Sequence, residues 1–476
     1  MSTRSPPRSV DVAVLGAGTA GLAAYHAALA TGARVLLVEH GARGTMCARV
    51  GCMPSKLLIA AADVAHGAKS AAPFGIRCAY EVDGSAVMER VRRERDRFVD
   101  SVVTRIDSIP AEQRLAGRAR FVSPGLLDVD GDGFAAPTRV EARAVVIATG
   151  SSPSVPSLFD AVRDRAAVSD DVFEWTTLPE SVAVFGSGAI GLELGQALHR
   201  LGVRVHVFGR GGTVGPLTDP VVRAAAELAL RSEMTLDAAA EVRAVRREGD
   251  GISVDFASDG HARVERFALA LLATGRQPNL AGLDLENAGV ALDAHGVPLF
   301  DPATMQCGSS AVFIAGDASH ALPVLHEAAN EGTMAGENAA RYPDVLARAR
   351  RSHLQIIFCD PQMALVGTSY EDLSRAGETV IGEVRFEHEG RSIIMGRKGG
   401  VARLYAELAS GRFLGAEMVG PRVEHLGHLL AWAHQQALTV DPMLAMPFYH
   451  PTMEESLRTA LRDVREQRRK AGRDAR

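Results

Sequence analysis

Aromatic residues are scarce in this chain of 476 residues, at 5%, and there are only five cysteines. A small, odd number of cysteines in a chain this long does not form the disulfide framework of a small secreted protein. Positive charge is not in excess either: the formal net charge is −5, which argues against a nucleic-acid-binding protein. Charged residues at 23% and hydrophobic residues at 47% exclude extensive disorder. The length then predicts a globular protein of about three domains.

We also expect neither a secretory leader nor a membrane span in this chain. No apolar core of a signal peptide precedes Asp11. Residues 12–33 carry no formal charge and are long enough to cross a bilayer, but four glycines break them into strand, loop and helix patterns. We therefore expect a cytoplasmic protein with no membrane segment and no nucleic-acid partner.

Glycine, in contrast, is abundant, and an excess over average usage indicates tight turns and close backbone approaches. Gly16, Gly18 and Gly21 follow the β-type run 10–15 and open a helical stretch. A second β-type run ends in Glu39, 23 residues after Gly16. In dinucleotide-binding folds such glycines let a pyrophosphate approach a helix N-terminus, and an acid at this spacing binds a ribose. The segment predicts a dinucleotide site, with a tight turn that binds nothing as the alternative.

The same pattern recurs between the strand-like segments 181–185 and 204–208. Its glycines are Gly186, Gly188 and Gly191. The position 23 residues after Gly186 is Gly209, so the ribose-binding acid is missing, and Arg210 comes next. A cation here attracts a 2′-phosphate that an acid would repel. The second site is therefore predicted to accept NADPH, although glycine does not exclude NADH and Arg210 has an alternative interpretation as a solvated loop residue.

Three further β-type runs end in short signatures. Ala-Thr-Gly closes the runs that end at Gly150 and Gly275, and Gly-Asp closes the run that ends at Asp317. Near-continuous apolar strands between helices are typical of parallel sheets covered on both faces. A carboxylate at the carboxyl end of a strand can accept hydrogen bonds from ligand hydroxyls. We therefore expect an α/β protein that binds two dinucleotides, and we place these three residues among the cofactor-binding positions.

Cys47 and Cys52 lie between the two glycine patterns. On a regular helix they would be roughly 8–9 Å apart, farther than the Cα separation of about 7 Å that a disulfide allows. Joining them requires an irregular turn, for which Gly51 and Pro54 are suited. In a cytoplasmic chain such a pair is more often redox-active or metal-binding than structural. Zinc needs two further ligands, and the other cysteines are scattered singly, so we expect a redox pair and no metal. Those cysteines are Cys78, Cys307 and Cys359.

In combination these motifs resemble the pyridine nucleotide-disulfide oxidoreductases, flavoenzymes of the lipoamide dehydrogenase and glutathione reductase type. The resemblance covers nearly the whole chain, from Val10 to about Arg462. The matching segments are Gly16–Gly18, Cys47–Lys56, Gly186–Glu193, Ala273–Asn279, Gly316–Asp317 and His450–Thr452 with Glu455. The resemblance implies two Rossmann-like domains and an α+β dimerisation domain. Its domain order is FAD at 1–150 and 277–345, NAD(P) at 151–276, and the interface at 346–476.

The resemblance also implies roles for single residues. The first glycine loop, Glu39 and Asp317 would bind FAD, and the second loop would bind the nicotinamide dinucleotide. Cys47 would be the interchange thiol that meets the substrate, and Cys52 would be the thiol next to the flavin. Electrons would pass between the two thiols and a substrate through a mixed disulfide.

Two charged pairs complete the implied site. Lys56 and Glu193 match an ion pair that the family places near the flavin, so both are expected to serve catalysis, and Lys56 also to bind the cofactor. His450 would act as the base at the interchange thiol, with Glu455 orienting its ring. In the family this dyad reaches the active site of the opposite subunit, which implies a homodimer.

Among members of the family the chain looks most like bacterial dihydrolipoamide dehydrogenases. We expect electron transfer between NAD(P) and a dihydrolipoyl-type dithiol, either a small molecule or a lipoyl group. Mercuric reductases and the large thioredoxin reductases carry extra redox residues at the C-terminus, whereas the last cysteine here is Cys359. Ala48-Arg49 and Gly209-Arg210 depart from the usual pattern. Two alternatives therefore stay open: an NADPH-dependent reductase of another small disulfide or a quinone, and a catalytically idle flavoprotein subunit.

Overall fold

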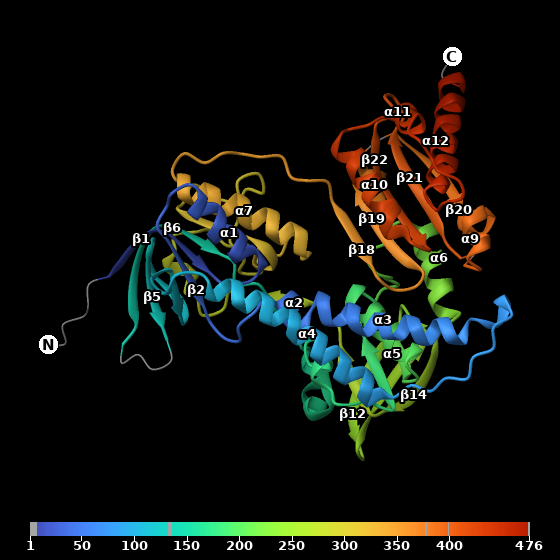
Figure 1. Cartoon of the computed structure of the whole chain (residues 1–476), viewed down its shortest axis with the longest axis horizontal. Coiled ribbons are helices and arrows are strands. Elements are labelled where there is room, and N and C mark those ends of the chain that lie inside the picture. The colour runs from blue at the N-terminus through green and yellow to red at the C-terminus, as the bar shows by residue number, and fades with distance from the viewer. Residues whose placement is uncertain (1–6, 132–135, 377, 398, 475–476) are drawn as a thin grey trace. The chain divides into compact units, whose positions relative to one another are not determined.

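The computed structural model describes residues 7–131, 136–376, 378–397 and 399–474, which fall into two compact units (Figure 1). Unit 1 takes its described residues from Met1–Pro54, Arg92–Ser154 and Arg276–Arg350, and unit 2 from Ser55–Val91, Val155–Gly275 and Arg351–Arg476. Within the described ranges, no helix combines the length and the apolar character that a membrane span requires. The four-part domain division inferred from the sequence stays a prediction.

Unit 1 is built on a seven-stranded sheet. Its strands are β1 (Arg8–Leu15), β2 (Val35–Glu39), β3 (Arg114–Ala116), β4 (Arg118–Ser123), β5 (Leu126–Asp130), β6 (Thr138–Ile147) and β17 (Val312–Ile314). The order is β3-β2-β1-β6-β5-β4, and β17 also pairs with β6. The pairings from β3 to β6 and that of β17 are parallel, whereas β5 and β4 continue the sheet in antiparallel fashion. The last four residues of β1 are apolar and buried, as expected of a strand covered on both faces.

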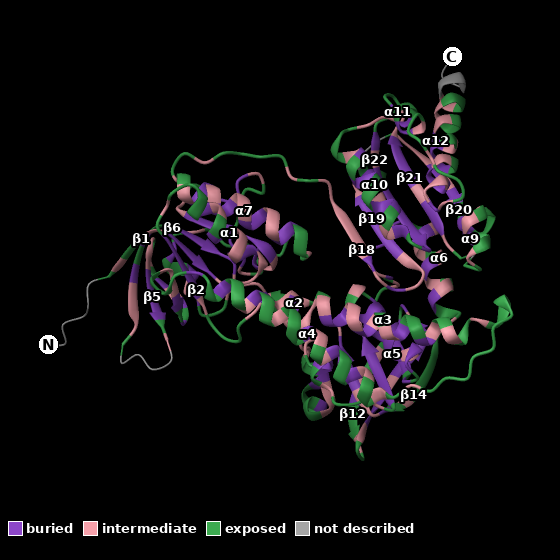
Figure 2. Ribbon diagram, viewed as in Figure 1, coloured by how far each residue is buried: buried purple, intermediate pink, exposed green. Residues whose placement is uncertain are grey.

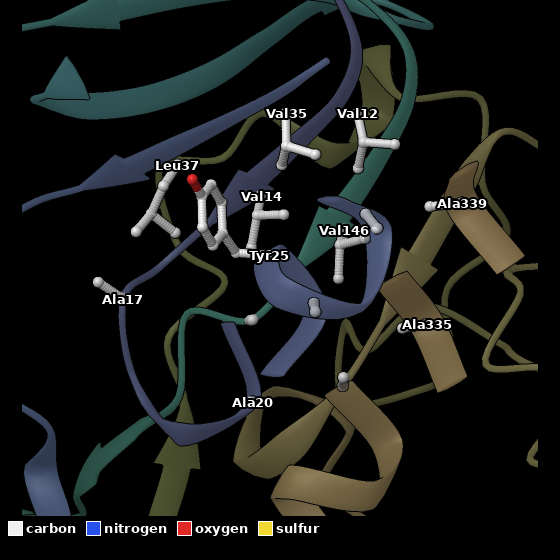
Figure 3. Close-up of a cluster of buried hydrophobic side chains, with 14 of the residues drawn as sticks. Val12, Val14, Ala17, Ala20, Tyr25, Val35, Leu37, Val146, Ala335 and Ala339 are labelled. Carbon is white, nitrogen blue, oxygen red and sulfur yellow. The ribbon is translucent and has the colours of Figure 1, made fainter. Parts of the chain in front are cut away.

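Helices α1 (Thr19–Ala30) and α7 (Leu325–Arg341) lie side by side against this sheet (Figure 1). Glycine permits their close approach: a Cβ at Gly332 would lie 2.1 Å from the carbonyl oxygen of Ala20, and one at Gly336 would lie 2.2 Å from that of Ala24. The side chains between sheet and helices form one buried apolar cluster, part of which Figure 3 shows. Among them are Val12, Val14, Tyr25, Val35, Leu37, Val146, Ala335 and Ala339. The first glycine loop therefore stands on a packed support.

Unit 2 contains three sheets. The parallel one has the order β11-β10-β9-β15-β8, and its strands are β8 (Ala166–Val168), β9 (Ser181–Phe185), β10 (Arg204–Phe208), β11 (Thr235–Asp237) and β15 (Leu269–Leu272). An antiparallel sheet follows, made of β12 (Glu241–Glu248), β13 (Gly251–Ser258) and β14 (His261–Phe267). The C-terminal antiparallel sheet has the order β18-β19-β22-β21-β20. Its strands are β18 (Leu354–Ile357), β19 (Gln362–Gly367), β20 (Thr379–Arg385), β21 (Val401–Glu407) and β22 (Phe413–Gly420).

Helices flank the sheets of unit 2. They include α5 (Ala189–Arg200), α6 (Pro220–Arg231), α10 (Val423–Gln435) and α12 (Glu455–Asp474). The C-terminal sheet is largely buried (Figure 2), because α10 packs on β19 and α12 packs on β20. Strands β9 and β10 coincide with the predicted segments 181–185 and 204–208. One partly parallel and one parallel sheet, each with a glycine loop, and a C-terminal α+β part confirm the predicted fold class.

A buried ionic cluster connects α6 to the C-terminal sheet within unit 2. Asp219 caps α6 and is fully buried. Its two carboxylate oxygens accept hydrogen bonds from Nη1 of Arg403, both at 2.8 Å, and one also accepts from the Tyr405 hydroxyl at 2.9 Å. Glu417, also fully buried, accepts from the backbone N–H groups of Thr218 and Asp219 at 2.7 and 2.8 Å. Arg403 is thus the cation that contacts the buried Asp219 carboxylate.

The Arg403→Met variant is expected to lower the free energy of unfolding by about 3–5 kcal/mol, because it leaves the Asp219 carboxylate buried without its counter-charge. Urea titration of the purified protein measures this change. Arg385→Met is the matched control, since Arg385 pairs with Glu383 at 2.9 Å with half of its side chain exposed, and such pairs contribute at most about 1 kcal/mol. Equal losses in the two variants would contradict the prediction.

Candidate active site

Cys47 and Cys52 stand on either side of a break between two helices of the chain. Cys47 belongs to α2 (Met46–Val50), and α3 (Cys52–Lys69) begins at Cys52. Gly51 between them has non-helical angles, φ −122° and ψ −118°, and a Cβ there would lie only 3.1 Å from the Cα of Cys47. The break brings the two side chains within hydrogen-bonding contact, which a continuous helix would not allow. The irregular turn expected from the spacing is present, and both cysteines are free thiols.

The two thiols influence each other's ionisation. The pKa of Cys47 is raised by its hydrogen bond with Cys52, by burial and by the charge that Cys52 carries when ionised. The backbone N–H groups of Cys52 and Met53, at the first turn of α3, act in the opposite direction because they stabilise a Cys47 thiolate. Groups coupled in this way lose their protons one after the other. The pair is therefore arranged to hold one thiolate beside one thiol.

The first glycine loop leaves space where a phosphate would approach. Gly16 has φ +109°, and a Cβ there would lie 2.3 Å from the carbonyl oxygen of Ala148. A Cβ at Gly21 would lie 1.8 Å from the carbonyl oxygen of Gly16. At Gly18 nothing lies within 4 Å, and α1 begins there without a side-chain cap. The outer glycines are thus needed for packing, while the middle one opens a helix N-terminus that suits a pyrophosphate.

Polar groups at the carboxyl ends of the strands in unit 1 complete this cradle. The Glu39 carboxylate, at the end of β2, accepts the backbone N–H of Ala17; burial raises the pKa of Glu39, and this bond lowers it. Asp317 follows β17 and accepts a hydrogen bond from the Ser151 hydroxyl at 2.7 Å. The Thr149 hydroxyl is buried and has no hydrogen-bond partner among the described residues. An orphaned hydroxyl and two carboxylates beside an uncapped helix fit a dinucleotide with ribose hydroxyls.

Arg276 is a residue that the sequence did not single out. It lies in β16 (Arg276–Pro278), which pairs with β7 (Ser151–Pro153) directly after Gly150. Its guanidinium donates to the hydroxyl of Ser151 at 2.9 Å and to the carbonyl of Ser151 at 2.8 Å, and it contacts the sulfur of Met46 at 2.6 Å. Arg276 therefore links Ser151, the hydrogen-bond partner of Asp317, to Met46, the residue before Cys47. Its sequence signal is its place in the matching segment Ala273–Asn279, directly after Gly275.

The second glycine loop repeats the geometry of the first within unit 2. A Cβ at Gly186, whose φ is +118°, would lie 2.2 Å from the carbonyl oxygen of Ala273, and one at Gly191 would lie 1.9 Å from that of Gly186. Gly188 again faces open space, and α5 begins there without a side-chain cap. The two loops thus share the same division between packing glycines and an open one. This second helix N-terminus also suits a pyrophosphate.

The position where a ribose-binding acid is missing is closely packed. A Cβ at Gly209 would lie 2.4 Å from the hydroxyl oxygen of Ser187 and 2.6 Å from the carbonyl oxygen of Ala238. A carboxylate side chain therefore does not fit there unless both Ser187 and the backbone at Ala238 move. Arg210, the next residue, is exposed. The loop offers a cation and no anion to a bound nucleotide.

Lys56 and Glu193 form the ion pair that the sequence suggested. Nζ of Lys56, in α3, lies 2.7 Å from Oε2 of Glu193, in α5. The other oxygen of Glu193 accepts the backbone N–H of Phe358 at 2.9 Å, and the Lys56 ammonium lies 4.8 Å from the centre of the Phe358 ring. The Glu193 side chain is 8% exposed and that of Lys56 is 36% exposed. Glu193 is thus the anchored partner, and Lys56 has one side open to solvent.

His450 and Glu455 also meet. Nδ1 of the His450 ring lies 2.7 Å from Oε2 of Glu455, which begins α12, and Arg458 contacts the other oxygen of Glu455 at 3.1 Å. The Glu455 side chain is 16% exposed, whereas that of His450 is 79% exposed. A carboxylate held in this way fixes Nδ1 as the protonated nitrogen and leaves Nε2 free to take up a proton. The free edge of the ring faces solvent.

The sequence-derived residues therefore gather into three pairs and two loops, each within one unit. The cysteine pair and the first loop belong to unit 1, and the two charged pairs and the second loop belong to unit 2. Gly150 and Gly275 both have positive φ, +72° and +101°. In the part of the chain that the structure describes, no cluster of three or more His, Cys, Asp and Glu side chains is placed to hold a metal ion.

Comparison with known proteins agrees with this geometry. The family model for pyridine nucleotide-disulphide oxidoreductases matches residues 10–332, and the model for the dimerisation domain of that family matches residues 354–461. A mercuric reductase from Acidithiobacillus ferrooxidans is 31% identical, over 98% of this chain and 85% of its own length. A dihydrolipoyl dehydrogenase from Haloferax volcanii is 32% identical, over 94% and 95%.

Solved structures show the same fold. LpdA from Mycobacterium tuberculosis has a TM-score of 0.82 at 23% identity, over 96% of this chain and 99% of its own. The HOCl-induced flavoprotein disulfide reductase RclA from Escherichia coli has a TM-score of 0.79 at 20% identity, over 95% and 99%. From the matched models, the two relatives and the geometry of the thiols and loops, we conclude that the chain belongs to the pyridine nucleotide-disulphide oxidoreductase family.

Proposed function

We propose that this enzyme passes electrons between a dihydrolipoyl-type dithiol and NAD(P) through FAD and the redox pair Cys47 and Cys52. Its family uses FAD and NAD(P)H. The observation that carries the proposal is the contact between the two thiols across the break at Gly51. Two thiols in contact can exchange two electrons by forming and breaking one disulfide. The dihydrolipoyl dehydrogenases among the relatives support the choice of substrate.

The two loops would hold the cofactors. Gly18 and the N-terminus of α1 would receive the FAD pyrophosphate, with Glu39 and Asp317 accepting hydrogen bonds from its hydroxyl groups. The N-terminus of α5 at Gly188 would receive the pyrophosphate of the nicotinamide dinucleotide. Bound FAD supplies the two-electron relay between the nicotinamide and the dithiol. The open space at both middle glycines supports this assignment.

The cysteine pair would then oxidise the dithiol in two thiol–disulfide exchange steps. Starting from the disulfide, a substrate thiolate attacks Sγ of Cys47, and the bond between the two cysteines breaks to release the Cys52 thiolate. The second substrate thiol displaces Cys47 from the mixed disulfide and leaves as a cyclic disulfide. Two electrons then reside on the cysteine pair, and the substrate has lost two protons. The backbone N–H groups at the start of α3 stabilise the Cys47 thiolate as it departs.

His450 would take up the proton of the attacking thiol. The Glu455 carboxylate orients the ring and stabilises its charged form, as in other pairs of a base and an orienting group. The chain carries the dimerisation domain of its family, so we propose a homodimer in which His450 of one subunit serves Cys47 of the other. The high exposure of His450 within one chain supports this arrangement.

Steady-state rates test the substrate. Dihydrolipoamide, lipoamide, oxidised glutathione, a quinone and Hg(II) would each be assayed with NAD(H) and with NADP(H). We expect the highest kcat/KM with the lipoamide couple. Preferential turnover of glutathione or a quinone would replace the proposed substrate by the second candidate below. Absence of turnover with every substrate would identify an idle flavoprotein subunit. Hg(II) is included because mercuric reductases are among the relatives, although the last cysteine, Cys359, is buried.

A second candidate is NADPH-dependent reduction of another small disulfide or of a quinone. The specific observation that favours it is the second loop, where Gly209 leaves no room for an acid and Arg210 is exposed. A loop with a cation and no anion favours the nucleotide that carries a 2′-phosphate. This candidate shares the cysteine pair and both loops with the first.

Arg210→Gln is expected to raise KM for NADPH about five- to tenfold, with a change of less than about twofold for NADH, because an exposed charged contact with a phosphate contributes roughly 1 kcal/mol. Steady-state assays with NADPH and with NADH measure the change in KM for each nucleotide. Arg243→Gln, at a half-exposed arginine of β12, is the control and should change neither constant. A parallel rise for both nucleotides would show that Arg210 does not contact the 2′-phosphate.

A further inference from the structure

Arg200, the last residue of α5, is a buried cation surrounded by carboxylates. Its side chain is 4% exposed. Nη1 contacts Asp63 of α3 at 2.9 Å, and Nε and Nη2 contact the two oxygens of Glu233 at 2.7 and 3.0 Å. Nη2 also contacts Asp360, in the turn between β18 and β19, at 3.0 Å. One guanidinium thus joins three segments that are far apart in the sequence.

Three carboxyl groups, those of Asp63, Glu233 and Asp360, contact the single guanidinium of Arg200. Burial alone would raise the pKa of Glu233, but hydrogen bonds from His66 and Arg200 lower it to about 2. Arg397 contacts the Asp360 carboxylate from the outer side. Burial raises the pKa of Asp63, the Arg200 charge lowers it, and the Asp360 charge raises it further, so these two carboxylates repel each other. Without Arg200 the cation that contacts both carboxylates is lost, and the contact of Arg397 with Asp360 is left to oppose this repulsion between α3 and the turn.

The Arg200 cluster is in register with the Lys56–Glu193 pair. Lys56 and Asp63 are seven residues apart on α3, and Glu193 and Arg200 are seven residues apart on α5. Seven residues are close to two helical turns, so each helix presents both members on one face. The two helices, labelled in Figure 1, are therefore tied by two ion pairs. Each tie joins a buried group on α5, Glu193 or Arg200, to a more exposed partner on α3, Lys56 or Asp63.

The turn that carries Phe358 and Asp360 is also held by side chains of α5. The side-chain amide of Gln196 donates to the carbonyl of Asp360 at 2.6 Å and accepts the backbone N–H of Asp360 at 2.7 Å. Two residues earlier, the backbone N–H of Phe358 donates to Glu193. The place of this N–H, which orients the Glu193 carboxylate, is therefore fixed by the anchoring of Asp360. That anchoring rests on Gln196 and on Arg200.

We propose that Arg200 is a positioning residue for the Lys56–Glu193 pair. The proposal rests on the proposed function, in which this pair lies at the flavin. Loss of the Arg200 charge would let Asp63 and Asp360 repel each other, displace the turn that carries Phe358, and loosen Glu193 and with it Lys56. Lys56 follows Cys52 by four residues in α3, so its ammonium and the Cys52 thiolate share one face of the helix. A displaced Lys56 stabilises that thiolate less.

The test uses the full-length, FAD-loaded enzyme. The two-electron-reduced protein is titrated with pH while the long-wavelength absorbance of the thiolate next to flavin is followed. In Arg200→Met we expect the midpoint to rise by about one pH unit, the lower end of the effect of a nearby opposite charge. In the double variant Arg200→Met/Asp360→Asn, which keeps the backbone bonds to Gln196, one of the two repelling carboxylates is neutral, so the midpoint should return toward the wild-type value. Arg200→Gln, with the same expected rise as Arg200→Met, carries the test if Arg200→Met does not fold.

Arg403→Met is the matched control, because it removes another arginine that pairs with a buried carboxylate in unit 2 and touches neither α3 nor α5 in any described contact. It should lose stability and keep the wild-type midpoint. An unchanged midpoint in Arg200→Met, or in Arg200→Gln if Arg200→Met does not fold, with the band present in the wild type, would overturn the role of Arg200 and leave the proposed function intact. A rise that persists undiminished in the double variant would contradict the repulsion between Asp63 and Asp360 as its cause. A wild-type enzyme without the band would overturn the proposed function itself.

Discussion

Cys52→Ser is expected to yield a protein that binds FAD but turns over a dithiol substrate on the order of 10³-fold or more slowly, as enzymes do when they lose a reacting nucleophile. Serine cannot form the disulfide with Cys47, so the substrate's electrons cannot be stored on the pair. Reduction of bound FAD by NAD(P)H should persist, because that step does not involve the thiols. The variant should also lack the thiolate-to-flavin absorbance band on two-electron reduction.

Stopped-flow spectra and steady-state rates of the same preparation measure both effects. Cys78→Ser is the matched control, since Cys78 is an exposed cysteine outside the helix break and should be dispensable. The proposed mechanism would be wrong if the wild type showed no thiolate band, or if Cys52→Ser turned over within tenfold of the wild-type rate. A dithiol enzyme that works without one of its thiols would need a different electron path.

The second large effect is expected at His450. Replacing it with glutamine should lower kcat/KM for the dithiol by about 10²–10⁴-fold, the usual contribution of a general base. Glutamine retains a polar side chain but cannot take up a proton. Glu455→Gln should cost less, roughly tenfold, because the ring keeps its basic nitrogen and loses only the carboxylate that orients it at 2.7 Å.

His428→Gln, at an exposed histidine of α10 bonded to a backbone carbonyl, serves as the control and should leave the rate unchanged. Rates measured across pH separate a lost base from a general structural defect, because the limb that reports the base should disappear only in His450→Gln. If His450→Gln retained both the wild-type rate and the wild-type pH profile, another group would have to take the proton.

The fold was accessible from the sequence where its signals are local. The unit of strand, glycine loop, helix and second strand occupies about 30 consecutive residues. Its whole pattern can therefore be seen in one stretch of sequence, and the predicted segments at Gly16 and Gly186 coincide with β1, α1, β9 and α5. The spacing of Cys47 and Cys52 required an irregular turn, and Gly51 provides it. For the C-terminal part, in contrast, the resemblance implied only an α+β domain, and its antiparallel sheet was not predicted, because pairing between distant strands leaves little trace in any short window of sequence.

The residues that escaped prediction are those whose partners are remote in the chain. Arg276 contacts Ser151 and Met46, and Arg200 contacts Asp360 across 160 positions. No motif connects such positions, because each contact depends on how separate elements are brought together. The steric reason for Gly209 was also hidden, since only the structure shows how close Ser187 lies to the place of a Cβ. Motifs within one stretch of sequence could therefore be predicted, whereas contacts between residues that are far apart in the chain could not.

The order in which unit 1 receives its parts bears on how the protein is made. Strand β17 and helix α7 come from residues 312–341, although they complete a sheet and a helix pair begun by β1 and α1 near the N-terminus. Domains generally fold as units while the chain is synthesised. During synthesis the N-terminal part of unit 1 cannot complete its fold until α7 has been made. Until then the alanine-rich face of α1 stays uncovered while the inserted segments of unit 2 emerge from the ribosome. A chain truncated before α7 would contain the whole first glycine loop. It would lack the helix that packs against α1, so the core beneath the loop would stay incomplete.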